Sequence, residues 1–148
     1  MKMLGRVIAF GFVSGLVWSV VPGILANLFM TTTDVPATVV AGIIAGIATS
    51  ALLGSLVAKF GRGVAVMLGL LSLPIGSFVF GFALALIDRF LPALASGTRA
   101  PLGPWTLGLN YAVLSVISIF AIGLFPLAVF TTLFLRAFIV RGNKTNSA

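Results

Sequence analysis

The chain contains no cysteine, no histidine and no glutamate among its 148 residues. Without cysteine it can form neither a disulfide framework nor a redox thiol, and it cannot carry a prenyl or palmitoyl anchor. Haem held by histidine, and zinc held by histidine or cysteine, are excluded as well. A serine nucleophile needs a neighbouring base, and the chain has no histidine to act as that base. We therefore expect no cofactor, no metal site and no enzyme activity.

Charge is the second thing that the sequence has little of. Only 7% of the residues are charged, 60% are hydrophobic, and the mean hydropathy is +1.26. A soluble domain is usually about a quarter charged. So few charges cannot give a body of this size a water-soluble surface, so lipid must be its main solvent. At roughly 20 residues per crossing, the length suits about four membrane spans.

Four apolar runs, separated by polar or proline-rich connections, fit this expectation. The predicted fold is an all-α integral membrane protein, a single membrane domain of four transmembrane helices in a bundle. Trp105 marks a water boundary at the start of the last span. Asp34 reads as the helix N-cap before the second span. The predicted spans are 4–30, 36–58, 64–87 and 105–135, with a long connection at 90–104 and a polar tail at 141–148.

The net charge of +7 is best explained by topology rather than by nucleic acid. Seven basic residues fall on one side of the predicted membrane, and Arg89 and Arg99 fall on the other with both acids, Asp34 and Asp88. This bias predicts that both termini are cytoplasmic, and it suits a bacterial inner membrane. The basic turn that contains Lys59 and Arg62 can also bind anionic lipid head groups.

Small residues recur every fourth position in the first two spans. In a bilayer such rows let helix backbones approach closely, which favours association. Because both spans carry a row and a short loop joins them, we expect them to pack together as an antiparallel pair. The predicted packing residues are Gly11, Gly15, Ser19, Gly23, Gly42, Gly46, Ser50 and Gly54.

A second small row, Ala41, Ala45 and Thr49, lies beside the first on span two. Two interpretations stay open at this stage. The row is a contact with another copy or a larger partner, or spans one, three and four of the same chain bury it.

Prolines and hydroxyls supply the remaining polar features of the spans. Kinks are expected at Pro22, Pro74 and Pro126, because proline removes a backbone donor inside a helix. Hydroxyls in membrane helices usually bond to their own backbone, although they can also line a path at such kinks. The hydroxyls at membrane depth are Ser14, Ser19, Thr49, Ser50, Ser72, Ser77, Ser115, Ser118, Thr131 and Thr132.

Two functions follow from these patterns. The first is a non-catalytic subunit or assembly element of a membrane complex, either with other membrane proteins or as a homo-oligomer. The alternative is an oligomeric channel or transporter for a small solute, with a hydroxyl-lined path at the proline kinks. No ionisable residue is expected inside the membrane, so the usual mark of a proton or ion pathway is missing.

Overall fold

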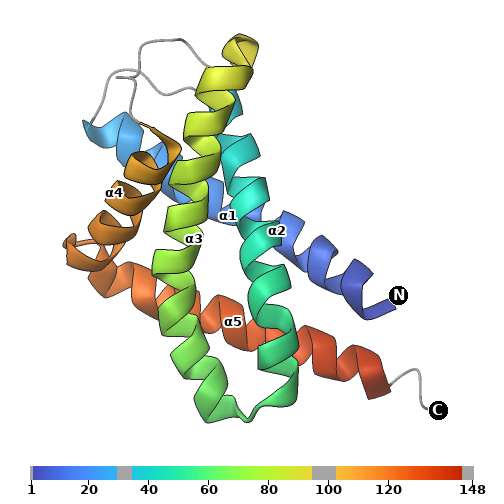
Figure 1. Ribbon diagram of the computed structural model, residues 1–148. Helices are drawn as coiled ribbons and strands as arrows, with labels where there is room; N and C mark the ends of the chain where they lie inside the picture. Colours follow the sequence, from blue (N-terminus) through green and yellow to red (C-terminus); the bar gives the residue numbers. More distant parts are fainter. Residues whose placement is uncertain (1, 30–34, 95–102, 145–148) are drawn as a thin grey trace.

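The computed structural model describes the backbone of residues 2–29, 35–94 and 103–144, and it is helical almost throughout that part (Figure 1). Side-chain surroundings are described for residues 4–20, 35–91, 93–94 and 103–140. The elements are α1 (Lys2–Phe29), α2 (Val35–Lys59), α3 (Arg62–Phe90), the short 3₁₀ helix η1 (Pro92–Leu94), α4 (Pro104–Ile117) and α5 (Ala121–Lys144).

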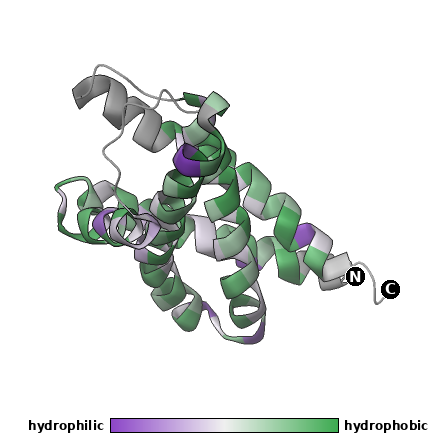
Figure 2. Cartoon of the chain, turned by 45° about the horizontal axis from the view of Figure 1, so that its top comes forward, coloured by the Kyte–Doolittle hydropathy of each residue, from purple (hydrophilic) through white to green (hydrophobic). Residues whose placement is uncertain are grey.

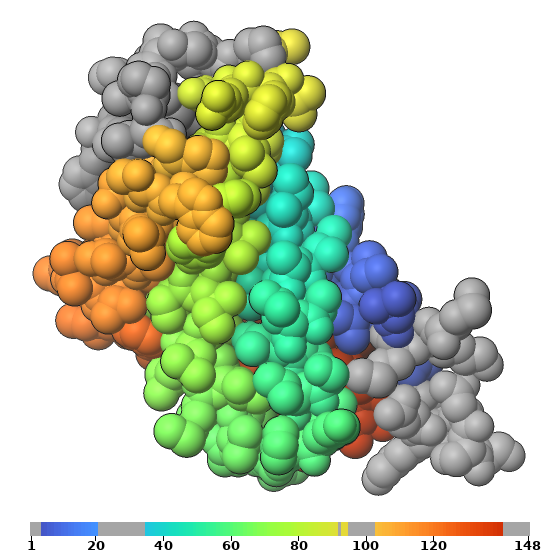
Figure 3. All heavy atoms as spheres, in the orientation of Figure 1, coloured from blue at the N-terminus to red at the C-terminus, as the bar shows by residue number. Residues whose placement is uncertain are grey.

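The helices form two layers with an oblique crossing between them. In Figure 1, α2 and α3 stand side by side as an antiparallel pair, while α1 and α5 run obliquely behind them. The short α4 lies along α3, and these neighbours keep the same relation in the space-filling view of Figure 3. In the view of Figure 1, α1 and α5 both extend to the right of α2, and the α2–α3 turn lies at the bottom.

Within the described residues, three helical segments are long and apolar enough to cross a membrane: Val35–Lys59, Arg62–Phe90 and Ala121–Val140. Two more apolar helical segments, Leu4–Val20 and Pro104–Ile117, are shorter. Figure 2 shows hydrophobic colouring over most of the described helices. The all-helical, membrane-type architecture predicted from composition is therefore observed.

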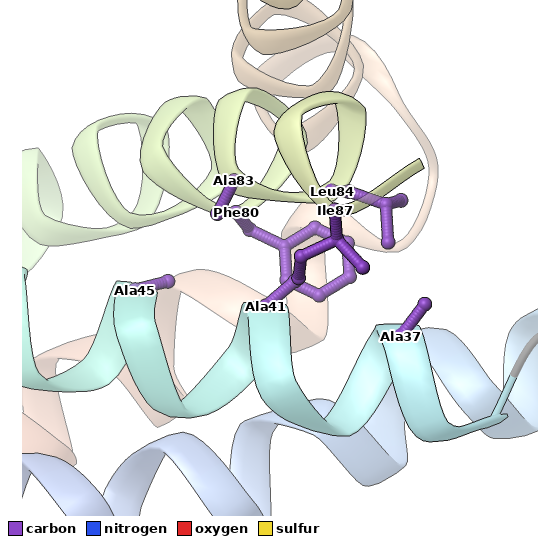
Figure 4. Close-up of a cluster of buried hydrophobic side chains, with 7 residues drawn as sticks. All are labelled: Ala37, Ala41, Ala45, Phe80, Ala83, Leu84 and Ile87. Carbon is purple, nitrogen blue, oxygen red and sulfur yellow. The ribbon is translucent and has the colours of Figure 1, made fainter. Parts of the chain in front are cut away.

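Alanines on α2 and larger side chains on α3 form the largest buried cluster. Ala37, Ala41 and Ala45 point from α2 toward α3 (Figure 4). The short side chains on one helix leave room for long ones on the other, which keeps the contact dense. Their partners on α3 are Phe80, Ala83, Leu84 and Ile87.

The predicted span at 105–135 is not one helix. Helix α4 ends at Ile117, the chain turns through residues 118–120, and α5 begins at Ala121. At Ser118 the backbone adopts ψ 153°, an extended value that a helix cannot continue through. The Ser118 carbonyl then accepts a hydrogen bond from the Ala121 N–H at 2.9 Å. Hydropathy alone missed this break, because isoleucine and phenylalanine occupy the turn and keep the run apolar.

Several sequence predictions fall where little is described. Helix α1 continues through Pro22 and Gly23, but the surroundings of these two side chains lie outside the described residues. The same holds for Asp34 and for most of the connection at 90–104. Helix α3 runs through Pro74 and α5 through Pro126 without ending at either. Helix α5 also extends to Lys144, into the segment predicted as a polar tail.

Candidate binding cavity between the helices

The first helix pair is held by backbone contact. A Cβ atom added to Gly11 would lie 2.6 Å from the Ile47 Cα, and one added to Gly46 would lie 2.6 Å from the Gly15 Cα. A Cβ on Gly15 would likewise collide with the Gly42 carbonyl oxygen. These positions therefore admit only glycine without a shift of the helices. The structure brings together the two small rows predicted from the sequence.

The other predicted packing residues take different places. Ser19 is buried, and its Cβ would lie 2.6 Å from a Cβ added to Gly42. A Cβ added to Gly54 would lie 3.2 Å from a methyl carbon of Val7, which is a looser contact. Ser50 is buried and also lines the cavity described below.

Sequence reasoning did not identify the small residues that join α3 to its other neighbours. A Cβ on Gly81 would lie 2.7 Å from the Leu107 carbonyl oxygen of α4, and one on Gly69 would lie 2.7 Å from the Val129 Cα of α5. Gly81 belongs to a short row of small residues, Ser77, Gly81 and Ala85. Gly69 follows the small Ala65, but Leu73 interrupts that row four residues later.

The second small row of α2 is covered within the chain. Ala41 is 0% exposed and Ala45 is 7% exposed, both against α3. Thr49, the third member of this row, borders the cavity rather than a helix surface. Of the two interpretations left open by the sequence, the described contacts therefore match burial by the chain's own helices.

Helices α1 and α5 meet at two separated places. Near one end, the Phe10 ring lies 6.5 Å from that of Phe134 and 6.1 Å from that of Phe138, centroid to centroid. Further along α1, the Trp18 Nε1 donates a hydrogen bond to the Thr131 Oγ1 at 3.3 Å. Large side chains at both places keep the two helices apart, so that space remains around Ser14 between them.

That space is part of a cavity of about 490 Å³ to which all five helices contribute. Nine of the ten hydroxyl residues predicted at membrane depth line it; Ser19 is the exception. None of the described lining residues is charged. The hydroxyl-bearing lining residues are Ser14, Thr49, Ser50, Ser72, Ser77, Tyr111, Ser115, Ser118, Thr131 and Thr132. The remaining aromatic lining residues are Phe10, Trp18, Phe80 and Phe120.

Most of the hydroxyls with described hydrogen bonds donate to their own helix. The hydroxyls of Ser72 and Ser115 each lie 2.7 Å from the backbone carbonyl three residues earlier. Those of Thr131 and Thr132 reach back four residues, at 2.8 and 2.9 Å, and that of Ser14 reaches back three at 3.2 Å. This is the behaviour expected of hydroxyls in membrane helices. Their oxygen lone pairs remain available to an occupant of the cavity.

Thr49 differs from these residues. Its Oγ1 is buried and has no hydrogen-bond partner in the described part of the chain. A buried hydroxyl without a partner is costly, because it has lost its bonds to water and gained none in return. Thr49 is therefore the lining residue whose hydroxyl would be stabilised most by a hydrogen bond to a ligand.

Two of the predicted proline sites border the cavity. Pro74 lies between Ser72 and Gly76 on α3, and both of these residues line the space. Pro126 lies between two lining residues of α5, Leu124 and Ala128. Each proline leaves one helix carbonyl without its usual donor.

No protein-family model, curated protein or solved structure matches this chain. The cavity is therefore the feature from which a function has to be argued.

Two residues that line the cavity beside the break between α4 and α5 are also partly exposed. Leu114 is 55% exposed and Phe120 is 39% exposed, yet both line it. Ser118, where the backbone turns, lines it as well. Non-helical backbone at membrane depth is tolerated where it borders a cavity or is buried in protein. The break at residues 118–120 and the cavity therefore lie side by side.

Proposed function

We propose that this protein belongs to the transport class, and that it binds a small uncharged molecule in the cavity and passes it across the membrane. The observation that carries the proposal is the convergence of nine hydroxyl residues, predicted as scattered membrane-depth groups, on one uncharged cavity. A volume of about 490 Å³ lies within the range that small-molecule sites commonly have. This corresponds to the second of the two functions that the sequence suggested.

The chemistry of the lining supports a neutral solute. A charged group placed in a low-dielectric site is costly unless an opposite charge pairs with it. None of the described lining residues supplies such a charge. Hydroxyls and aromatic rings instead suit a molecule with a few hydrogen-bonding groups and an apolar remainder.

We further propose four crossings, with both termini cytoplasmic. Contacts at one end of the molecule support this arrangement. The Arg136 Nε donates a hydrogen bond to the Phe60 carbonyl at 3.2 Å, and Val7 of α1 packs on Ile139 of α5. The basic residues Arg6, Lys59, Arg62 and Arg136 lie beside these contacts in the chain, as a shared cytoplasmic face requires.

Helices α4 and α5 together supply the fourth crossing in this proposal. Trp105 packs on Phe82 near one end of α3, and Arg136 bonds to Phe60 just beyond the other end. From Arg62 to Phe82, α3 rises through 20 residues, about 30 Å, which is the thickness of a hydrocarbon core. The broken pair covers the same depth, whereas the 14 residues of α4 alone would cover only about 21 Å.

The assembly function stays a prediction with weaker support. Its best clue was the second small row, and Ala41 and Ala45 are buried under α3. An oligomer, or a complex with other membrane subunits, would have to use a different surface. Binding of anionic lipid at Lys59 and Arg62 is also proposed, because both residues are exposed at the α2–α3 turn. A bacterial inner membrane stays the expected location.

Liposomes that contain the purified protein test the transport function. We expect faster osmotic swelling with butane-1,4-diol, which has an apolar chain between its hydroxyl groups, than in protein-free liposomes, and no increase in potassium flux. Gly76→Leu should abolish the gain. Gly76 lines the cavity, and a Cβ there would meet only the Thr49 Oγ1 at 3.4 Å, so the first added atom meets no backbone and the rest of the side chain occupies the cavity.

Gly5→Leu is the matched control. Gly5 is exposed on α1, and a Cβ added there would meet nothing within 4 Å. This variant should transport like the parent protein. If no solute passes, and the protein purifies from native membranes with a stoichiometric partner, the assembly function replaces the transport proposal.

A further inference from the structure

We infer that the occupant of this cavity is a neutral, largely apolar molecule that carries a hydroxyl group, and that Thr49 recognises that group. The inference deepens the proposed function and rests on it. It follows from which hydrogen-bonding atoms of the lining are already used and which are not.

Thr49 is a hydrogen-bond donor that lacks an acceptor in the described part of the chain. Its Oγ1 is buried without a partner, and across from it lies Gly76, which has no side chain to offer. The nearest α3 position therefore leaves room beside the hydroxyl instead of satisfying it. An oxygen atom of a ligand placed there would accept a hydrogen bond from the Thr49 hydroxyl, which removes the free-energy cost of the unpaired group.

The remaining hydroxyls of the lining supply hydrogen-bond acceptors. Five of them already donate to backbone carbonyls: Ser14, Ser72, Ser115, Thr131 and Thr132. Each hydroxyl has one proton and two lone pairs, so a hydroxyl that has donated can still accept. The lining consequently offers several acceptors, and Thr49 adds a buried donor that has no partner in the described part of the chain. A ligand hydroxyl satisfies both with a single atom, because it also donates one bond and accepts others.

The aromatic lining indicates what the rest of the ligand is like. Phe10 and Trp18 face the cavity from α1, Phe80 from α3 and Phe120 from the break before α5. These rings favour an apolar body. Because Leu114 and Phe120 line the space while remaining exposed, an apolar molecule can enter from the lipid beside the α4–α5 break.

A carboxylate or an ammonium group fits this site poorly. Hydroxyl oxygens can contact a cation, but none of the described lining residues carries a charge to neutralise it. An anion could accept a hydrogen bond from Thr49, but none of the described lining residues is a basic side chain that would neutralise its charge. An alcohol or a phenol avoids this cost, since it hydrogen-bonds without carrying charge.

Trp18 provides a direct readout of occupancy, because it lines the cavity. The chain has two tryptophans, so Trp105→Phe leaves Trp18 as the only one. Trp105 packs on the rings of Phe78 and Phe82, and phenylalanine preserves a ring there. In lipid nanodiscs, quenching of Trp18 fluorescence by 10-bromodecan-1-ol should saturate. It should reach half-saturation at about a fivefold lower mole fraction in lipid than quenching by 1-bromodecane.

Variants of Thr49 identify the recognising atom. Thr49→Val keeps the shape and removes the hydroxyl, so it should erase the preference for the alcohol, and Thr49→Ser should retain it. Thr38→Val is the matched control, since Thr38 is a buried threonine on the same helix that does not line the cavity. It should leave the preference unchanged, with thermal unfolding of every variant measured alongside.

The outcomes separate the two proposals. Saturable quenching with equal affinity for the alcohol and the bromoalkane, unaffected by Thr49→Val, overturns hydroxyl recognition but leaves the cavity as a binding site. Tighter binding of 10-bromodecanoate than of the alcohol overturns neutrality. If none of the three probes gives saturable quenching, or if Gly76→Leu fails to abolish it, the cavity is not a binding site and the proposed function fails with it.

Discussion

Helix α1 makes two contacts of opposite kinds. Toward α2 it presents Gly11, Gly15 and Ser19, which are all buried, and the glycines of this row touch the partner backbone. Toward α5 it presents Phe10, Ser14 and Trp18, which are all half-buried and which border the cavity. Both rows repeat every fourth residue, so both follow one face of the helix.

The difference shows how side-chain size decides between a dense contact and a cavity. Glycine along the first row lets the backbones touch, which leaves no room for a ligand. In the second row, Phe10 and Trp18 hold α5 at a distance, while the short Ser14 leaves the middle open. A large, small, large order along one row is sufficient to produce a hollow between two helices.

The strongest way to break the dense contact is Gly46→Ala. The added methyl would collide with the Gly11 carbonyl oxygen and lie 2.6 Å from the Gly15 Cα, both of which are backbone atoms that cannot move aside alone. We expect a loss of about 3 kcal/mol in the free energy of unfolding. Unfolding in mixed micelles with increasing SDS measures it.

Gly123→Ala is the control for this substitution. A Cβ on Gly123 would meet nothing within 4 Å, so only the helix propensity changes. Stability should rise by about 0.5 kcal/mol. Equal effects of the two substitutions would mean that the α1–α2 contact is not close-packed.

Cysteine labelling tests the contrast between the two faces of α1. Because the chain has no native cysteine, only the introduced thiol can react. Ser14→Cys places a thiol in the cavity, whereas Ser19→Cys places one in the buried contact with α2. We expect N-ethylmaleimide to modify the first about tenfold faster, because a buried thiol reacts only after local opening. Mass spectrometry of samples taken over time gives both rates. Similar rates would remove the distinction between the faces.

Phe10→Ala tests the aromatic side of the comparison. It removes two ring contacts with α5, and it should lower the free energy of unfolding by about 1 kcal/mol. Phe130→Ala is the control on α5, since Phe130 is 72% exposed. The same SDS titration applies, and a larger loss for Phe130 than for Phe10 would contradict the described packing.

The smallest effect is expected from Trp18→Phe, which removes the hydrogen bond to Thr131 but keeps a ring. Bonds of this kind between membrane helices contribute about 0.6 kcal/mol. A double-mutant cycle with Thr131→Val measures the coupling between the two residues. A coupling of zero would show that this hydrogen bond does not hold α5 against α1.

Sequence reasoning reached the helical class, the first three helices and the α1–α2 contact because each depends on a local repeat. The predicted spans 36–58 and 64–87 lie close to α2 and α3. The break at residues 118–120 was not predicted, since no proline or glycine occupies it and the run stays apolar. The contact between Gly81 and Gly108 was not predicted because it joins positions on helices whose mutual register no local pattern reveals.

By itself, the sequence determined that the chain is helical and built for lipid, because composition and periodicity act over a few turns of one helix. It also determined that the polar side chains expected at membrane depth are neutral, with no acidic or basic side chain among them. Only the tertiary structure decided that α3 covers Ala41 and Ala45, and that nine hydroxyl residues from five helices and the α4–α5 break line one cavity. The reason is that a cavity depends on the spacing between helices, which is set by pairs of residues far apart in the chain.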